Sequence, residues 1–595
     1  MINFLGADTA FNYDIWKLIA VALIFFMQAG FAMCEAGFTR AKNTGNIVMK
    51  NLMDFCLGTV AFIIIGGPIL CAGSAIGGFI GAPGQVYGDI FGDPKNYDWT
   101  NFIFNLVFCA TTATIVSGAM AERTNFKAYC VYSVIISAII YPVEAFWNWG
   151  VGTNGDTIGW LQTLAHDMGL QEFIDLSGSC SIHMVGGLTA LIGAWILGPR
   201  IGKYTRDENG KVIKVNAIQG HNLLMGSLGV FILWFGWYGF NPAACTSYNG
   251  YGGIGQVFMT TTVAAAFATV AVMIITWVKN GKPDVSMTLN GSLAGLVAIT
   301  AGCARVDLVG AIVIGIVAGI LLCFGVEFID KTLHIDDPVG ACSVHFINGA
   351  WGTIACGLFA RESGLFYGHG FDQLLVQTIG VVTVCAWTAA CSLIMFLIMK
   401  SIKRKDGSSW LRTTSEEEIR GLDITEHGLP SAYAGFAFAP EDINYENAIV
   451  VSGETPEALA VEVNTMPTVD TIKPGDPVIT KIEIICKERM LEKLKQSLMA
   501  IGITGMTVSH VMGCGVQKGQ PEYYRGVKVE PTLLPKVQVD IVVCEVPVSK
   551  VVETVKKALY TGHIGDGKIF IYNVLDVIKV RTGEQGLAAL KNVDE

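Results

Sequence analysis

Two histidines lie inside apolar segments in nearly identical four-residue contexts that are far apart in the chain. The first context is Cys180-Ser181-Ile182-His183, and the second is Cys342-Ser343-Val344-His345. An aspartate precedes each histidine by eight residues, and a glycine follows each by four. Because an ionisable side chain is costly to place in a membrane interior, each histidine is a candidate functional residue. The repeat therefore predicts one site that is built from two matching segments.

Two buried imidazoles can share a hydrogen bond and relay a proton, since the unperturbed pKa of histidine lies near physiological pH. A bare cation meets a large desolvation penalty in a dry pore, so loss of its proton lowers the barrier, and ammonium is such a cation. A helix-bridging hydrogen bond is the alternative interpretation for each histidine. A metal site is disfavoured, because no carboxylates or thiolates are arranged as ligands beside the imidazoles. We interpret the preceding Asp175 and Asp337 as helix caps.

The composition indicates a membrane protein. Of the 595 residues, 52% are hydrophobic and 15% are charged, whereas about a quarter of the residues are charged in a typical soluble protein. The sixteen cysteines mostly fall inside apolar segments and form no Cys-x-x-Cys pair, so we interpret them as small buried hydrophobic residues. The net charge of -10 disfavours a nucleic-acid partner.

Long, nearly uncharged stretches recur from Ile15 to Lys400, and a membrane span needs about 20 such residues. They predict an all-α polytopic membrane protein with eleven transmembrane helices, in which small residues let neighbouring helices approach closely. His183 falls in the fifth predicted span and His345 in the tenth. This placement indicates two halves of five spans with opposite topologies, a 5+5 inverted repeat of the kind found in transporters. The two histidines would then meet near the middle of the membrane.

Lysines and arginines are concentrated in one set of alternating loops, which includes Arg123, Arg200 and the cluster from Lys400 to Lys405. Positively charged loops face the cytoplasm. We therefore expect a plasma-membrane protein with its N-terminus outside and its C-terminal part in the cytoplasm. The first apolar run lacks a preceding basic region, so no cleavable signal peptide is predicted.

From about residue 400 the composition becomes more polar, and we divide the chain into four parts. Residues 1–405 form the predicted transmembrane domain, residues 406–435 a cytoplasmic tail, residues 436–477 a proline-containing linker and residues 478–595 a second folded domain. Alternating valines and isoleucines in this last domain predict four strands, and the helical spacing of apolar residues predicts two helices. The order strand, helix, strand, strand, helix, strand is typical of a ferredoxin-like α+β fold.

An ordered set of motifs within residues 10 to 435 resembles the ammonium transporter family (Amt/Mep/Rh). The motifs are Ala119-Met120-Ala121-Glu122-Arg123, Trp147-Asn148-Trp149-Gly150, Asp175 with His183, Trp237-Tyr238-Gly239-Phe240-Asn241-Pro242, Asp336-Asp337-Pro338 with His345, and Gly421-Leu422-Asp423 with His427-Gly428. No single motif decides the matter, but the set is specific because type, order and spacing all agree.

The resemblance implies an ammonium pore in a homotrimer. It assigns Phe108 and Phe240 to a stacked aromatic gate and Trp149 to the wall of an outer vestibule that recruits ammonium. Asp175 and Trp237 belong to the pore by the same resemblance, together with the two histidines. A cation over an aromatic ring gains on the order of 1 to 2 kcal/mol, which partly offsets its dehydration. Without the resemblance, ordinary packing would account for these aromatic side chains.

A second set of motifs, in residues 479 to 590, resembles the P-II nitrogen-signalling proteins. The motifs are Gly513-Cys514-Gly515-Val516-Gln517-Lys518-Gly519, Tyr524-Arg525-Gly526, Leu534-Pro535-Lys536, the run from Thr561 to Phe570, and Arg581-Thr582-Gly583-Glu584. Glycines let backbone N–H groups approach phosphates, and basic side chains balance an acidic ligand. The resemblance implies that ATP or ADP binds here, and that 2-oxoglutarate binds with Mg-ATP. The residues expected at this site are Gly515, Gln517, Lys536, Gly565, Gly567, Lys568, Lys579 and Arg581.

The same resemblance implies a regulatory loop at residues 520–533, which contains Tyr524 and Arg525. In transporter complexes of stand-alone P-II proteins, the arginine of the Tyr-Arg-Gly motif enters the cytoplasmic pore exit, and Arg525 holds this position. Both families are trimeric, so their three-fold symmetries match. The covalent tether raises the local concentration of the regulator to the order of mM.

These features together predict an ammonium transporter that is regulated by a fused P-II domain and is not an enzyme. The alternative is an ammonium sensor that signals through the P-II domain with little flux. Two departures from the family pattern keep this alternative open. Ala244 replaces a serine whose hydroxyl accepts a hydrogen bond from ammonium, and Phe346 replaces a small residue after the second histidine.

Restoring the missing hydroxyl tests the outer recruitment site. Ala244→Ser is expected to tighten the apparent affinity for ammonium by at least about tenfold, because a hydrogen bond to a charged group contributes about 1.5 to 3 kcal/mol. The concentration dependence of ammonium uptake measures this affinity, with Ala244→Gly as a control that adds no acceptor. An unchanged concentration dependence in Ala244→Ser would contradict this model of the outer site.

Overall fold

The computed structural model describes residues 9–92, 94–245, 247, 250–429, 479–487, 490–513, 522–524, 527–529, 534–561, 566–580 and 582–590. Contacts divide the described residues into two compact units. One unit holds the helices before residue 430, and the other holds the four-stranded sheet after residue 478. The predicted linker, residues 436–477, lies outside the described residues, as do residues 430–435 of the predicted tail.

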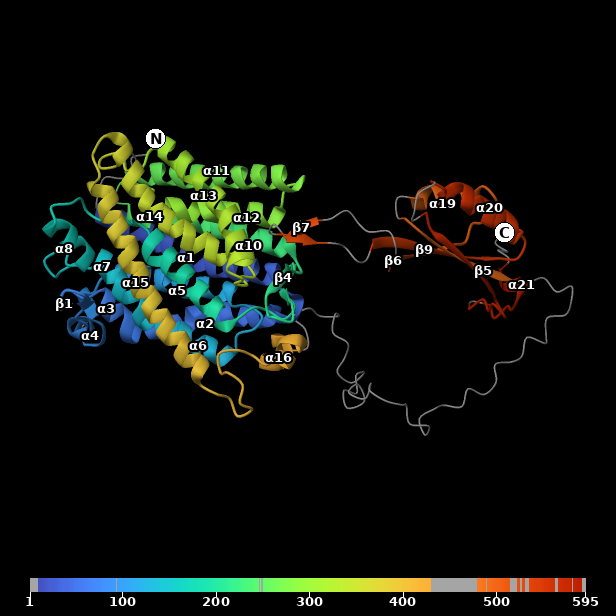
Figure 1. Cartoon of the computed structure of the whole chain (residues 1–595), viewed down its shortest axis with the longest axis horizontal. Helices are drawn as coiled ribbons and strands as arrows, with labels where there is room; N and C mark the ends of the chain where they lie inside the picture. Colours follow the sequence, from blue (N-terminus) through green and yellow to red (C-terminus); the bar gives the residue numbers. More distant parts are fainter. Residues whose placement is uncertain are drawn as a thin grey trace. The chain divides into compact units, whose positions relative to one another are not determined.

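The first unit is a bundle of helices (Figure 1). Within the described residues, nine helical segments are long and apolar enough to cross a membrane. They are built from α1 (Thr9–Phe38), α2 (Thr44–Ala61) with η2 (Phe62–Gly66) and α3 (Gly67–Leu70), α5 (Trp99–Ala119), α6 (Phe126–Ile135) with η4 (Ile136–Ile140) and α7 (Tyr141–Trp149), η5 (Ser179–Met184) with α9 (Val185–Leu197), α10 (Leu223–Phe240), α11 (Ile254–Asn280), α13 (Leu308–Glu327) and α15 (Asp372–Ser401). The bundle is therefore mostly helical, as the sequence predicts.

The two predicted spans that are not among these nine segments coincide with shorter helical segments. Helix α12 (Val285–Ile299) is apolar but only 15 residues long. The segment that carries His345 consists of η8 (Cys342–Ile347) and α14 (Asn348–Phe359). The length and apolar character of the helices therefore confirm a polytopic helical protein, and the count of eleven spans stays a prediction.

Helices differ in how deeply the bundle buries them. In the most apolar window of α5, 94% of the residues are buried, whereas only 33% are buried in the corresponding windows of α11 and α15. The exposed faces of these two helices are themselves apolar, for example at Val278 and Val382. Apolar outer faces are expected of helices that lie in hydrocarbon rather than water. Helix α5 is thus central, and α11 and α15 are peripheral.

The two histidine-bearing segments cross each other at glycines. A Cβ atom on Gly187 of α9 would lie 2.2 Å from the backbone nitrogen of Phe346, and one on Gly349 of α14 would lie 2.5 Å from the carbonyl oxygen of Ser179. Each glycine thus faces the backbone of the other segment's histidine-bearing turn. Small residues at a helix crossing let backbones approach closely. The repeated glycine of the sequence pattern therefore permits the close crossing that brings the two histidines together.

The second unit has the predicted order of elements. It contains β5 (Thr480–Cys486), α19 (Leu491–Met499), β6 (Thr507–Gly513), β9 (Leu534–Val543), α20 (Val548–Leu559) and β10 (Lys568–Asn573). The strands form an antiparallel sheet in the order β10-β5-β9-β6. Alternate residues of β5 point to the core, where Ile482 and Ile484 are buried with Leu494 of α19 and Val551 of α20. Apolar residues alternate along the strands and recur every three to four residues along the helices between them. Both patterns can be seen in the sequence, so the sequence predicts where these elements lie.

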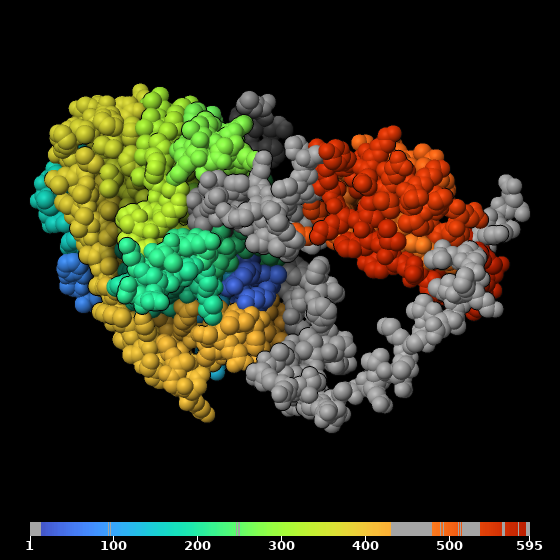
Figure 2. Space-filling model, turned by 45° about the vertical axis from the view of Figure 1, so that its right-hand side comes forward, coloured from blue at the N-terminus to red at the C-terminus, as the bar shows by residue number. Residues whose placement is uncertain are grey.

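A short polar tail closes one side of the helical unit. It contains α16 (Ser415–Arg420) and α17 (Leu422–His427). The carboxylate of Asp423 accepts hydrogen bonds from the backbone nitrogens of Gly45 and Asn46 at 3.0 and 2.8 Å, so it binds the N-terminal end of α2. Figure 2 shows the tail in orange beside the teal segment near residue 200, where Glu418 accepts a hydrogen bond from the nitrogen of Ile201. We call this side of the helical unit the tail side.

Candidate functional site

The two histidines meet inside the helical unit. Nδ1 of His183 lies 3.2 Å from Nδ1 of His345, and the ring centroids are 5.3 Å apart. Both side chains are buried, with exposed fractions of 0% and 5%. A hydrogen bond between these atoms requires one Nδ1 to donate and the other to accept, so the two rings carry complementary tautomers. The pair is therefore arranged to share or transfer one proton.

The two aspartates that precede the histidines cap the histidine-bearing turns. The Asp175 carboxylate accepts hydrogen bonds from the backbone nitrogens of Gly178, Cys180 and Ser181. The Asp337 carboxylate accepts equivalent bonds from the nitrogens at positions 339, 340 and 342. Burial raises the pKa of Asp175 to about 6, although its backbone donors act in the opposite direction. Both segments therefore begin at a carboxylate that fixes the start of the turn.

Aromatic rings form a column that ends at the histidine pair. Phe108 and Phe240 are stacked at a tilt of 32° with their centroids 4.5 Å apart, and both are fully buried. The centroid of Phe240 lies 5.5 Å from that of His183. Trp237 stacks on His183 at 5.2 Å, and its indole nitrogen donates to the Thr300 hydroxyl. Trp237 is thus held as one wall beside the imidazole.

A polar cavity of about 650 Å³ opens at the far end of this column. Its lining includes Phe108, Trp149 and Ala244. The Trp149 indole nitrogen donates to the carbonyl oxygen of Asp175 at 3.0 Å, so this ring is fixed in the cavity wall. The structure therefore brings together all the residues that the sequence assigned to the pore. We call this cavity the vestibule; it adjoins the first turns of α1, away from the tail side.

Sequence reasoning missed two ionisable residues of α1 that line cavities of the helical unit. Lys17 lines the vestibule, where its ammonium group donates to the Asn101 side chain at 2.8 Å and lies 4.8 Å from the ring centroid of Phe104. Glu35 lines a smaller cavity with His345. The sequence did contain a signal for both residues, because a charged residue inside an apolar span is a candidate functional residue even when it is not part of a repeated motif.

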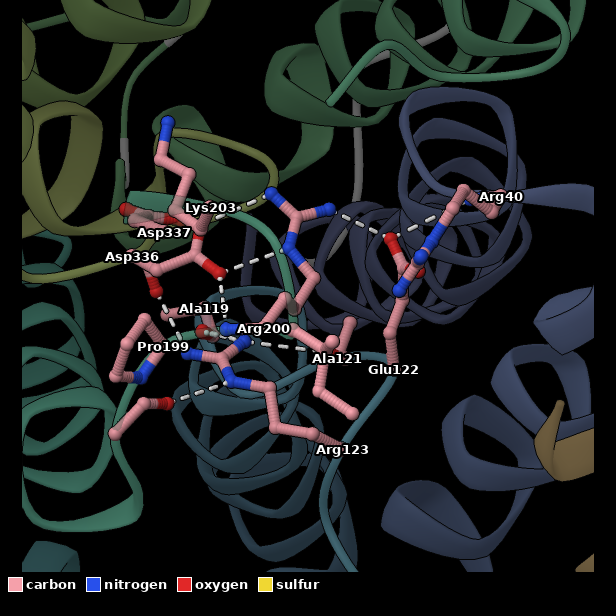
Figure 3. Close-up of polar contacts among 12 residues, drawn as sticks. Arg40, Ala119, Ala121, Glu122, Arg123, Pro199, Arg200, Lys203, Asp336 and Asp337 are labelled. Carbon is pink, nitrogen blue, oxygen red and sulfur yellow. Dashed lines mark hydrogen bonds and ion pairs between the residues drawn. The ribbon is translucent and has the colours of Figure 1, made fainter. Parts of the chain in front are cut away.

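A buried charge cluster on the tail side holds the second histidine segment (Figure 3). Arg200 donates to both carboxylate oxygens of Asp336 at 2.8 and 2.9 Å and to Glu122 at 2.7 Å. Arg40 also bonds to Glu122, and Arg123 donates to the carbonyl oxygen of Asp336 at 2.7 Å. Burial alone would raise the pKa of Asp336, but the Arg200 and Arg123 guanidinium groups hold it well below its usual range. The cluster is therefore ionised.

The cluster joins the tail to the turn that carries His345. Asp336 precedes the cap Asp337 in the chain. Arg200 belongs to the segment after α9, and the tail binds that segment through Arg412, which donates to the carbonyl oxygens of Leu197 and Pro199 at 2.8 Å. A continuous set of ion pairs and hydrogen bonds thus connects the tail with the cap of η8.

Two of the expected ligand-binding lysines lie at one end of the sheet in the second unit. Cys486 and Ile485, at the end of β5, pair with Val537 of β9 and Lys568 of β10. This register places Lys568 and Lys536 on the strands flanking the end of β5. Gly567 adopts a φ of 128°, and a Cβ there would lie 2.4 Å from the Ile485 carbonyl oxygen, so only glycine fits.

The remaining residues expected at this second site are placed only in part. Lys579 follows the opposite end of β10 and forms an ion pair with Glu584 at 3.7 Å. The other expected ligand-binding residues lie outside the described part of the chain, namely Gly515, Gln517, Gly565 and Arg581. Of the expected regulatory loop, Tyr524 belongs to β7 (Glu522–Tyr524), and Arg525 lies outside the described residues.

Two family models match this chain. Residues 15–432 match the Ammonium Transporter Family, and residues 479–584 match Nitrogen regulatory protein P-II. Ammonium transporter Amt2 of Archaeoglobus fulgidus is 42% identical over 441 residues, which cover 71% of this chain and 88% of that protein. Ammonium transporter 1 member 1 of Arabidopsis thaliana is 36% identical over 433 residues, covering 68% of this chain and 81% of the other.

Solved structures share the fold of the helical part. A protein named Sensor Amt Protein is 36% identical, with a TM-score of 0.62 over 70% of this chain and 98% of its own. Mep2 from Candida albicans is 26% identical, with a TM-score of 0.57 over 68% of this chain and 87% of its own.

Removal of the Asp336 charge tests the role of the buried cluster. Asp336→Asn is expected to destabilise the protein by about 3 to 5 kcal/mol, because it breaks a buried ion pair from one side. The apparent melting temperature in detergent measures the loss. A carboxylate with a lowered pKa contributes its full stability above its unfolded pKa of about 3.9, so the loss should be equal at about pH 6 and about pH 8.

The control is Glu327→Gln, which breaks the ion pair of Glu327 with Lys279, whose side chains are 20% and 46% exposed. An exposed pair of this kind contributes less than about 1 kcal/mol. Equal losses of melting temperature in the two variants would contradict the proposed role of the cluster.

Proposed function

Because this chain belongs to the ammonium transporter family, we propose that it conducts ammonium across the plasma membrane through the histidine pair, under the control of its P-II domain. The observation that supports this proposal best is the contact of 3.2 Å between Nδ1 of His183 and Nδ1 of His345 at the end of a closed aromatic column. Members of this family are channels and transporters rather than enzymes.

The vestibule supplies the recruiting step of the proposed path. The aromatic rings of Trp149 and Phe108 line this cavity, with their centroids 6.0 Å apart. An aromatic face near a cation offsets part of the free energy of dehydration. Phe108 and Phe240 close the inner end of the vestibule, so a hydrated cation does not fit past them without displacement of the rings. This arrangement favours the passage of a dehydrated species.

The histidine pair supplies the proton-handling step. Removal of one proton from ammonium leaves neutral ammonia, which avoids the penalty for a buried charge. A neutral imidazole beside the gate can accept that proton, and the second imidazole can receive it through the shared Nδ1 contact. Passage of ammonia and transfer of the proton then follow separate routes past the same pair.

The topology that we propose has eleven transmembrane helices in a 5+5 inverted repeat. It counts α12 and the η8–α14 segment as spans besides the nine longer segments. The matching caps at Asp175 and Asp337 and the reciprocal glycine contacts support the repeat. The distribution of Lys and Arg supports an outer N-terminus and a cytoplasmic C-terminal domain. We further propose a homotrimer, in keeping with the resemblance to both families.

The P-II domain is the proposed regulator. Lys536 and Lys568 flank one end of its sheet, where basic groups can bind the phosphates of ATP or ADP. The resemblance adds 2-oxoglutarate with Mg-ATP as a second ligand and the loop with Tyr524 and Arg525 as the element that blocks the pore exit. The domain boundaries at residues 405, 435 and 477 are part of this proposal.

Loss of either imidazole tests conduction. In proteoliposomes, His183→Ala and His345→Ala are each expected to reduce the ammonium-evoked current at least about tenfold, since a positioned acid or base contributes about 100-fold or more to proton transfer. His166→Ala is the control, because the His166 side chain is 91% exposed. Undiminished currents in both pair variants would refute the relay.

A second candidate function is that of an ammonium sensor with little flux. The similarity to a solved protein named Sensor Amt Protein favours it, as does the methyl group of Ala244 in the vestibule wall where a hydroxyl is expected. In this case occupancy of the vestibule changes the state of the P-II domain, and that domain transmits the signal. The two candidates differ in whether flux accompanies occupancy.

Ligands of the P-II domain separate the two candidates. If the chain is a regulated transporter, ATP, ADP or 2-oxoglutarate at the cytoplasmic face should change the ammonium current of the full-length chain by at least about twofold. A chain truncated after residue 435 should give a ligand-independent current. Ammonium-dependent nucleotide binding without current would instead favour the sensor, whereas a ligand-insensitive current in the full-length chain would contradict regulation.

A further inference from the structure

We infer that Glu35 accepts the proton that leaves the histidine pair on the tail side, an inference that rests on the proposed function. Glu35 lies in α1, three residues before that helix ends at Phe38, and its exposed fraction is 3%. A carboxyl group at such a position in an apolar span needs polar partners or a function, because its burial is costly.

One oxygen of the Glu35 carboxyl group is fixed by two neighbouring helices. Oε2 accepts a hydrogen bond from the Ser117 hydroxyl of α5 at 2.8 Å and a longer one from the Asn51 side chain of α2 at 3.4 Å. Among the residues that the structure describes, no hydrogen bond to Oε1 is found. The group is therefore oriented through one oxygen, which leaves the other oxygen for a ligand.

A small cavity connects Glu35 with the second histidine. Glu35, His345 and the Cys34 thiol provide its ionisable groups and Asn290 its amide, and apolar side chains such as Phe31 provide much of the remaining wall. The space open to the centre of a water molecule is about 30 Å³. A water needs about 10 to 15 Å³ by this measure and two to four polar partners. The cavity can therefore hold water between the imidazole and the carboxylate.

The nitrogens of the pair define the direction of the relay. Both Nδ1 atoms face each other, so each ring has Nε2 left for another partner. Within the described residues, Nε2 of His183 is buried without a hydrogen-bond partner. It can therefore accept a proton from ammonium. Nε2 of His345 can then donate to the water in the tail-side cavity.

The transfer conserves atoms and charge, but it exchanges the tautomers of the two rings, so the pair has to return to its starting tautomers before it accepts another proton. One N–H bond of ammonium breaks, its electron pair stays on ammonia, and a new N–H bond forms at Nε2 of His183. The Nδ1 proton of His183 moves to Nδ1 of His345, and the Nε2 proton of His345 moves through water to the Glu35 carboxylate. The resulting carboxylic acid later returns its proton to ammonia on the tail side, which restores ammonium.

Other ionisable groups near Glu35 lie outside the lining of this cavity. Lys50 and Asp54 belong to α2, and both are buried. Asp54 accepts a hydrogen bond from Tyr129, and the ammonium group of Lys50 lies 5.0 Å from the ring centroid of Tyr129. Among the described residues, Glu35 is therefore the carboxyl group in the lining of this cavity.

A glutamine at position 35 separates proton transfer from structure. Its amide oxygen can still accept from Ser117 and Asn51, but the amide does not take up a proton in this range of pH. In proteoliposomes of the full-length chain, Glu35→Gln is expected to reduce the ammonium-evoked current at least about tenfold. Passive ammonia entry, measured by internal alkalinisation under an ammonia gradient, should change by less than about twofold. Glu35→Asp should recover part of the current.

Asp54→Asn is the matched control, since it also neutralises a buried carboxyl group but outside the cavity. Its current should stay within about twofold of the unmodified chain. An undiminished current in Glu35→Gln, alongside the loss in His345→Ala, would refute the role of Glu35 and leave the proposed function intact. Equal losses in Glu35→Gln and Asp54→Asn would also refute it, because any change of buried charge would then suffice.

Infrared difference spectroscopy provides a readout that does not depend on flux. Addition of ammonium to the unmodified chain should produce the band of a protonated carboxylic acid, and Glu35→Gln should lack that band. If the unmodified chain carries no current, conduction fails as the function. The band would still identify Glu35 as the proton acceptor, whereas its absence would refute this role as well.

Discussion

The helical unit depends on one contact, the 3.2 Å approach of two buried imidazole nitrogens that come from segments 162 residues apart. Neither ring can be buried favourably without a polar partner, and each provides the partner of the other. The contact requires that two helical segments cross with almost no side chain between them. Gly187 and Gly349 satisfy this requirement, and the carboxylates of Asp175 and Asp337 fix where each segment begins. The repeated sequence pattern therefore reflects the same local arrangement of cap, histidine and crossing glycine in both segments.

The environment of the pair differs on its two sides. On the vestibule side, aromatic rings cover the pair and exclude water, which makes any charge there costly. On the tail side, a small cavity with a mostly apolar wall and the carboxyl group of Glu35 lie within the bundle. A proton relay needs such a difference, because an acceptor must be available on the side where the proton leaves. The two matching segments position the histidines alike, while the flanking residues make the two sides chemically different.

The tail-side charge cluster gives the helical unit a direct physical connection to its own tail. Arg200 binds two buried carboxylates, and the segment that carries it is bound by Arg412. A change that moves the tail must therefore break or reposition hydrogen bonds of charged groups that are mostly buried, which is costly. In the P-II domain, by contrast, the expected ligand groups Lys536 and Lys568 lie at the end of a regular sheet. Regulation by that domain, as proposed, would act on a helical unit whose tail is already fixed.

The sequence by itself determined the membrane class, both families, the order of elements in the P-II domain and the residues of the aromatic column and histidine pair. It did so because apolar runs, period-2 strands and ordered motifs are local properties of the chain. It did not identify Glu35, Lys17 or the Arg200 cluster as parts of a site, although all of these ionisable residues are visible in the sequence. Only the tertiary structure places these residues in cavities or in a charge cluster, because a cavity or a buried ion pair is formed by residues from several helices. The distance between such residues in the chain carries no information about their distance in space.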